Sequence, residues 1–227
     1  MRHVGLLGLV ALLGACVPQN TPPPNPNVPS TRIETTGSFY PLQTSFEWIY
    51  LPDRAGATDP SYRLTILGQG SFNNQVVTRY RFFGRGQDRI YYRQVDASGV
   101  RMLGFEEVVT ETVTRFDPPI QEYPAQANLI VGARWGGISR FTTDLRAGGR
   151  TTRFAEGQFE YTYTVLGRAN VSVQNNTYQV FRIGLERKTP ASGPNPAQTD
   201  TAEIWFVPNV GEVRTQEGLQ LLDRNFK

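Results

Sequence analysis

The chain has 227 residues, of which 39% are hydrophobic and 11% aromatic, so it is long and apolar enough to fold around a packed core and is not a disordered chain. Its formal net charge is +3, and the arginines are scattered among acidic residues instead of forming a basic run, which argues against a nucleic-acid partner. The only histidine, His3, and the only cysteine, Cys16, both lie close to the N-terminus.

The N-terminal segment has the pattern of an export signal. A cationic start at Arg2 leads into an apolar block over residues 4–13, which is too short to cross about 30 Å of hydrocarbon as a helix. The ending Leu13-Gly14-Ala15-Cys16 resembles the lipobox of bacterial lipoproteins, in which the thiol is acylated before cleavage. We therefore predict a signal peptide over residues 1–15 and lipidation, with palmitate, at Cys16. An ordinary secretory signal with an incidental cysteine is the alternative.

The single cysteine also bears on localisation. An exported protein with one unpaired cysteine needs an explanation, and acylation of Cys16 supplies it. Two or more acyl chains anchor a protein stably, and no later segment has 18 uninterrupted apolar residues, so the acyl chains are the predicted attachment to the membrane. Val17 and Pro18 include no acid of the kind that retains lipoproteins at an inner membrane. The predicted location is the cell envelope, at the outer membrane if the cell has two membranes.

Residues 16–36 form the predicted tether between the lipid and the folded domain. Prolines at positions 18, 22, 23, 24, 26 and 29 remove backbone donors and favour an extended polyproline II path. At about 3.1 Å per residue, the proline-rich residues 17–29 alone would hold the domain about 40 Å or more from the lipid surface.

The mature chain lacks two of the commonest catalytic groups. His3 leaves with the predicted signal peptide and Cys16 is acylated, so neither an imidazole nor a free thiol is left. Histidine acid–base catalysis, Ser-His and Cys-His nucleophile pairs, and His or Cys metal sites are thereby excluded. Chemistry that needs only carboxylates is still open, as in a glycosidase acid pair. We expect no catalytic residues, no metal site and no cofactor, and the ligand-binding residues are unknown from the sequence.

The remainder of the chain alternates as β structure does. Segments rich in β-branched and aromatic residues are separated by Asn- and Gly-containing turns, and no long window has helical periodicity. The predicted strands cover residues 62–67, 76–83, 89–95, 159–166, 178–185 and 202–207. We predict an all-β, antiparallel roll or barrel over residues 37–227, a single domain of roughly ten to fourteen strands. Residues 189–199, rich in Pro, Gly and Ser, predict a long mobile loop.

The chain also repeats a pattern, which predicts two related halves over residues 37–117 and 118–227. Trp48 matches Trp135, and Leu67-Gly68 matches Leu166-Gly167. Further along, residues 80–82 match 181–183, and residues 90–92 match 204–206. The alternative is coincidence, because strand-and-turn sequences are monotonous. If the halves are related, neither would bury both of its faces alone, and together they would close into one domain.

Two motifs indicate a family. Leu129-x-x-Gly132-x-x-Trp135 and the later Trp205-Phe206-Val207-Pro208-x-Val210-Gly211-x-Val213 resemble a family of exported, often lipidated bacterial proteins known mostly as a domain of unknown function. The resemblance covers about residues 37–225 and implies an antiparallel barrel or roll in the bacterial envelope, with no catalytic residues. The first half departs from the pattern, since Thr44-Ser45 stands where the glycine would be.

Acidic residues cluster between the two halves, at Glu106, Glu107, Glu111, Asp117 and Glu122. Neighbouring residues on a strand face opposite sides, so Glu106 and Glu107 cannot form one catalytic pair. We expect these acids to lie on solvated strand faces. Most of the aromatic residues are expected in the core, and large residues at matching places of the two halves (Tyr91 with Trp205, Tyr80 with Phe181) favour an interior filled by side chains.

The predicted function is a non-enzymatic binding or scaffolding role at the membrane surface, performed by a lipid-anchored cell-envelope protein. Its partners are the membrane, reached through acyl chains on Cys16, and an envelope protein, glycan or lipid. Two alternatives stay open: a carboxylate-dependent hydrolase of envelope glycans, and a lipid carrier with a cavity in the β roll.

Overall fold

The computed structural model describes residues 39–56, 58–173, 176–192 and 195–226. The predicted signal peptide, Cys16 and the whole of the predicted tether lie outside the described residues. Within the described part of the chain, no helix is both long enough and apolar enough to span a membrane.

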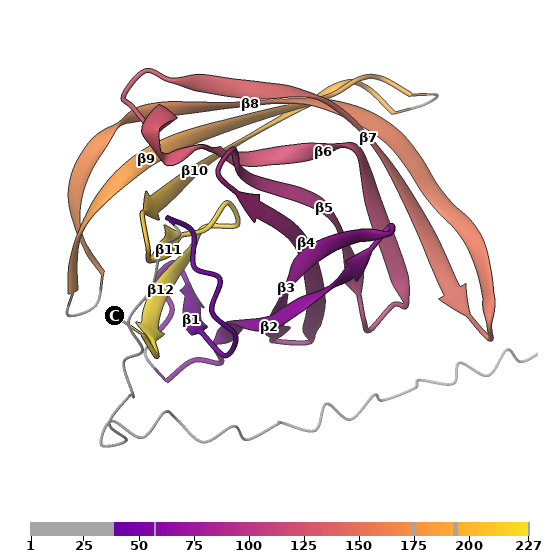
Figure 1. Cartoon of the computed structure of the whole chain (residues 1–227), viewed down its shortest axis with the longest axis horizontal. Coiled ribbons are helices and arrows are strands. Elements are labelled where there is room, and N and C mark those ends of the chain that lie inside the picture. Colours follow the sequence, from indigo (N-terminus) through magenta and orange to yellow (C-terminus); the bar gives the residue numbers. More distant parts are fainter. Residues whose placement is uncertain (1–38, 57, 174–175, 193–194, 227) are drawn as a thin grey trace, which may run out of the picture.

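The domain is a closed antiparallel barrel of twelve strands, each paired with its neighbours in the chain, with β12 returning to β1. Figure 1 shows the ring of strands. This confirms the predicted all-β, barrel-like fold. The strands are β1 (Glu47–Pro52), β2 (Tyr62–Phe72), β3 (Gln75–Gly84), β4 (Gln87–Asp96), β5 (Gly99–Glu107), β6 (Thr112–Pro124), β7 (Arg134–Ala147), β8 (Arg150–Val173), β9 (Asn176–Thr189), β10 (Gln198–Val207), β11 (Gly211–Arg214) and β12 (Leu219–Arg224), with a 3-10 turn, η1 (Gln126–Asn128), between β6 and β7.

The strands between residues 134 and 189 are the longest, and β8 alone has 24 residues. Strands β7, β8 and β9 extend beyond the ring formed by the shorter strands (Figure 1). The predicted long loop at residues 189–199 is instead the end of the β9–β10 hairpin, because β9 continues to Thr189 and β10 begins at Gln198. Between them, Ser192 and Asn195 exchange two backbone hydrogen bonds of 3.0 Å, so backbone pairing continues into this end.

The seam between β6 and β7 is only partly closed by backbone pairing. The ladder joins residues 112–117 of β6 to residues 140–145 of β7. Beyond this ladder, hydrogen bonds between side chains and backbone replace backbone pairing. The Gln121 N–H donates to the Tyr161 hydroxyl over 2.9 Å, and the Trp135 indole N–H donates to the Gln121 carbonyl over 3.2 Å. The Ser139 hydroxyl donates to the Pro118 carbonyl over 2.8 Å. These bonds satisfy strand-edge groups that would otherwise be buried without partners.

The two halves carry the same irregularities at matching places. The Ser45 N–H donates to the Ile66 carbonyl over 2.9 Å, and the Gly132 N–H donates to the Val165 carbonyl over 2.8 Å. Ser45 (φ 72°) and Gly132 (φ 86°) share the left-handed backbone region, which explains how a serine stands where the motif has glycine. A bulge follows in each half, at residues 66–68 and at residues 165–167.

The register changes two of the predicted matches between the halves. Ile66 pairs with Tyr80, whereas Val165 pairs with Ile183, so Tyr80 corresponds to Ile183 and not to Phe181. Tyr80 pairs with Tyr91 and Ile183 pairs with Ile204, so Tyr91 corresponds to Ile204 and not to Trp205. Insertions between strands hide this shift in the sequence, because only backbone pairing reports register. A duplication stays a prediction, which the shared bulges and hydrogen bonds support.

Side chains largely fill the interior of the barrel. After the grey trace of Figure 1, the indigo segment leading to β1 runs inside the ring of strands. Its Tyr40 packs against the rings of Tyr80, Tyr123 and Phe206, with centroids 5.9, 5.7 and 6.2 Å away. The Tyr80 hydroxyl donates to the Pro41 carbonyl over 2.9 Å, which fixes the segment in place. A smaller second core lies apart from this one, where the Phe72 and Tyr92 rings stack 4.1 Å apart.

Candidate functional site

The five acids that cluster in the sequence do not meet in the structure. Glu106 and Glu107 lie on opposite faces of β5, as predicted: the Tyr92 hydroxyl donates to Glu106 over 2.9 Å, and Glu107 pairs with Arg89. Glu111 is exposed in the β5–β6 turn, and Asp117 is exposed on β6. No pair among these four is placed to act on one bond.

Glu122 is the exception, and for it the predicted solvated strand face is wrong. Its side chain points into the barrel, where it accepts two hydrogen bonds from the Arg93 guanidinium, of 2.6 and 2.9 Å. Arg93 is 6% exposed and Glu122 is 9% exposed. The register between β5 and β6 shifts twice, so strand alternation counted from Glu106 does not carry over to Glu122. The result is a buried, bidentate ion pair between β4 and β6.

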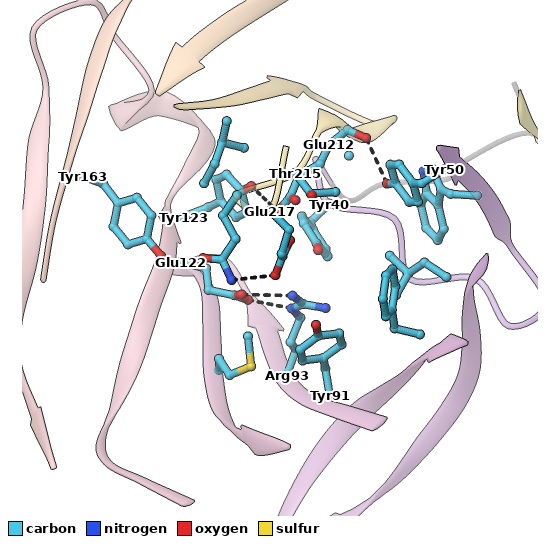
Figure 2. Close-up of a pocket in the computed structure, with 17 residues that line it drawn as sticks. Tyr40, Tyr50, Tyr91, Arg93, Glu122, Tyr123, Tyr163, Glu212, Thr215 and Glu217 are labelled. Atoms are coloured by element: carbon cyan, nitrogen blue, oxygen red, sulfur yellow. Dashed lines mark hydrogen bonds and ion pairs between the residues drawn. The ribbon is translucent and has the colours of Figure 1, made fainter. Parts of the chain in front are cut away.

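Aromatic rings surround the guanidinium of this pair. The Arg93 carbon Cζ lies 4.8 Å from the Tyr91 ring centroid, 5.1 Å from that of Tyr80 and 5.9 Å from that of Tyr40. Cation–π attraction of this kind offsets part of the desolvation of a buried arginine. Arg93 Nη1 is buried and has no hydrogen-bond partner among the described residues. In Figure 2 the side that bears this nitrogen points away from Glu122.

A second carboxyl group reaches the same region from β11. The Tyr123 hydroxyl donates to Glu212 Oε1 over 2.6 Å, and the Tyr50 hydroxyl donates to the Glu212 backbone carbonyl over 2.9 Å. Burial raises the pKa of Glu212 to about 7, while the Tyr123 hydrogen bond and the Arg93 charge oppose the rise and the Glu122 charge adds to it. Near neutral pH, therefore, Glu212 exchanges between its neutral and charged forms.

These groups line a cavity of about 50 Å³ inside the barrel. Figure 2 shows Arg93 and Glu122 facing one another, with Glu212 and Glu217 nearby. Tyr50, Tyr91, Tyr123 and Tyr163 are among the aromatic residues of its wall. The turn between β11 and β12 contributes Gln216 and Glu217, and the Gln216 amide donates to Glu217 Oε1 over 3.0 Å.

An open depression of about 400 Å³ adjoins the cavity. It is lined by Leu185, Arg187, Asp200, Thr201 and Ala202 of β9 and β10, and it shares Gln216 and Glu217 with the cavity wall. The β11–β12 turn therefore stands between the buried charged groups and an open surface. A second depression, of about 270 Å³, lies beside the β9–β10 hairpin and includes Ile138, Lys188 and Pro190.

The arrangement is suited to binding a small polar group. In the described part of the chain, no group of three or more His, Cys, Asp or Glu is placed to hold a metal ion. The cavity wall offers one guanidinium, two carboxyl groups inside the barrel, a third on the exposed Glu217, and several tyrosine hydroxyls. They surround a space that takes a few water molecules. Such a site can donate and accept hydrogen bonds and can hold a charge.

Comparison with known proteins adds no relative. No protein-family model matches the chain, and neither curated proteins nor solved structures give a significant match. The resemblance to a family of exported bacterial proteins therefore stays a prediction, with the site described from this chain alone.

Arg93, Glu212 and Glu217 are site residues that no motif in the sequence predicts. One signal was available for Arg93: it stands two residues after Tyr91, at the position that shares a strand face with an aromatic expected in the core. Glu212 likewise precedes Val213 in a motif already noted. No pattern in the sequence indicates that these residues face one another.

Proposed function

We propose that this protein is a lipid-anchored, non-enzymatic protein of the cell envelope that binds a small polar ligand or a polar group of a partner at its barrel. The observation that carries the proposal is the charged cavity of about 50 Å³, joined by the β11–β12 turn to an open depression of about 400 Å³. The anchor rests on the sequence pattern that ends at Cys16.

The size of the cavity argues against the lipid carrier. Sites for drug-sized ligands occupy roughly 300–1,000 Å³ and are mostly apolar. About 50 Å³ accommodates a few water molecules, and the wall carries Arg93, Glu122 and Glu212. An acyl chain would have to displace Tyr40 and the segment around it, which fill the barrel.

One observation supports the alternative function, a carboxylate-dependent hydrolase. Glu212 has a pKa raised to about 7, as a general acid requires, and Glu122 lies in the same cavity wall. Against it, Glu122 is held by Arg93 and the cavity is too small for a sugar ring, so binding is the better supported function. Activity on peptidoglycan fragments that disappears in Glu212→Gln would favour the hydrolase, with Glu106→Gln as the matched control.

Fractionation and native mass spectrometry test the proposal. Replacing Cys16 with alanine should release the protein from the membrane fraction, whereas a variant that stays membrane-bound and uncleaved would contradict the lipid anchor. The full-length protein, extracted in mild detergent, should show no acyl or polyprenyl lipid beyond that on Cys16. A stoichiometric lipid that survives detergent exchange would contradict the binding site proposed here and favour the lipid carrier.

A further inference from the structure

We infer that the barrel cavity binds a short amino alcohol, with its ammonium group between Glu212 and Glu217 and its hydroxyl group at Arg93. This inference rests on the proposed binding function and names the ligand class of the same site. Charge, aromatic lining, an unpartnered donor and size each contribute to it.

The charge of the cavity favours a cation. Arg93 is matched by Glu122 through two hydrogen bonds, so this pair is neutral overall. Glu212 and Glu217 take part in no ion pair with the described residues. When Glu212 is ionised, its carboxylate has no ion-pair partner among the described residues, and the exposed Glu217 adds a second carboxylate to the wall. A bound ammonium group would supply the counter-charge.

The aromatic wall favours the same charge. Tyr50, Tyr91, Tyr123 and Tyr163 line the cavity, and the faces of such rings attract ammonium groups. Burial raises the pKa of Tyr91 to about 12, so this phenol is neutral at physiological pH. Neutral hydroxyls leave the carboxylates as the only anions in the wall.

The unpaired nitrogen of Arg93 favours a ligand that carries a hydrogen-bond acceptor. Arg93 Nη1 is buried without a hydrogen-bond partner among the described residues, and a buried donor left unpaired is unfavourable. Arg93 itself lines the cavity, and Figure 2 shows the guanidinium between Glu122 and the tyrosines. A ligand hydroxyl oxygen would accept from this nitrogen, whereas a simple alkylamine would leave it unpaired.

The volume sets the length of the ligand. One water molecule needs roughly 10–15 Å³ of this kind of space, so a cavity of about 50 Å³ holds a handful of non-hydrogen atoms. Ethanolamine, with two carbons, one nitrogen and one oxygen, fits this limit. In an ethanolamine phospholipid the hydroxyl oxygen is esterified to phosphate, so the free amino alcohol, and not the lipid headgroup, is the ligand inferred here.

Binding is coupled to the ionisation of Glu212. The titratable and charged groups around it come from six places in the barrel: Arg93 from β4, Glu122 and Tyr123 from β6, Tyr50 from β1, Tyr163 from β8, Tyr40 from the segment before β1, and Glu217 from the β11–β12 turn. With a pKa of about 7, Glu212 is mostly neutral at pH 6 and mostly charged at pH 8. A ligand that requires the charged form should therefore bind about tenfold more tightly at pH 8 than at pH 6.

Calorimetric titration of the full-length protein in detergent tests the inference. Ethanolamine should bind at pH 8 at least about tenfold more tightly than ethylene glycol, which lacks the charge, and more tightly than ethylamine, which lacks the hydroxyl. Equal binding of ethanolamine and ethylene glycol, or no binding of ethanolamine, would overturn the inference.

Two further measurements separate the site from the fold. Glu212→Gln should lose at least about tenfold in ethanolamine affinity together with its pH dependence, while Glu106→Gln, away from the cavity, should bind as the unchanged protein does. If Glu212→Gln fails to fold, the unchanged protein still tests the role of Glu212. At pH 7 ethanolamine binding must release a fraction of a proton from Glu212, and the dependence of the binding enthalpy on the buffer measures this release. No proton release would refute the role of Glu212. Loss of the lipid anchor or of envelope location would contradict the proposed function without changing these results.

Discussion

Replacing Arg93 with methionine should destabilise the barrel strongly, because it leaves the Glu122 carboxylate buried and unpaired. The two side chains are only 7% and 11% exposed. Removing one partner of a buried ion pair typically lowers the free energy of unfolding by about 3–5 kcal/mol, since the remaining charge loses its partner but not its desolvation. We expect an effect of this size for Arg93→Met.

Removing both charges should restore most of that loss. In Arg93→Met combined with Glu122→Met, no buried charge is left and the interior keeps apolar side chains of similar length. Such replacements are often neutral or stabilising. The double variant should therefore be more stable than Arg93→Met alone, by about 2 kcal/mol or more.

An exposed pair supplies the matched control. Arg182 and Glu203 form the same bidentate geometry, but their side chains are 45% and 27% exposed. Because solvent screens such a pair, Arg182→Met should lower the free energy of unfolding far less than Arg93→Met does.

Urea-induced unfolding followed by circular dichroism measures all four proteins, with the m-value checking that the transitions are comparable. The reasoning is refuted if Arg93→Met and Arg182→Met have similar small effects, or if the double variant is no more stable than Arg93→Met. Either result would mean that solvent screens the Arg93–Glu122 pair as it screens the exposed one.

Three further predictions concern the fold and its dependence on pH. Gly136→Ala should lower the free energy of unfolding by about 1–3 kcal/mol, since its Cβ would lie 2.1 Å from the Tyr161 backbone oxygen, whereas Gly167→Ala, with no atom within 4 Å, should be near neutral in the same urea titration. Dividing the chain at Pro118 should leave neither half cooperatively folded, because the barrel closes only when β12 reaches β1; sharp thermal transitions from both fragments would argue for two domains. The raised pKa of Glu212 means that the folded state holds a proton that the unfolded chain has released, so this residue stabilises the fold below the ordinary glutamate pKa and that contribution is lost as pH rises through about 7. Between pH 5 and pH 8 the unchanged protein should therefore lose stability relative to Glu212→Gln, and parallel curves would disprove the assignment.

The barrel could be predicted from the sequence because its signals are local. Alternation along residues 62–67 and 76–83 depends on the two-residue period of a strand, and the turns between strands depend on Asn and Gly. Leu67-Gly68 and Leu166-Gly167 were visible as a repeat for the same reason, and they prove to be the two bulges. Each of these features involves residues that are neighbours in the chain.

The charged site depends on tertiary structure, because its members are distant in the chain. Arg93 meets Glu122 across 29 residues, and Tyr123 meets Glu212 across 89. Which face of β6 carries Glu122 is decided by bulges whose presence shifts the alternation, and a shift of one residue exchanges the inner and outer faces of a strand. The sequence by itself therefore determined a closed, antiparallel β domain with a repeated pattern. Only strand register in the closed barrel decided that one arginine and three carboxyl groups face a common cavity.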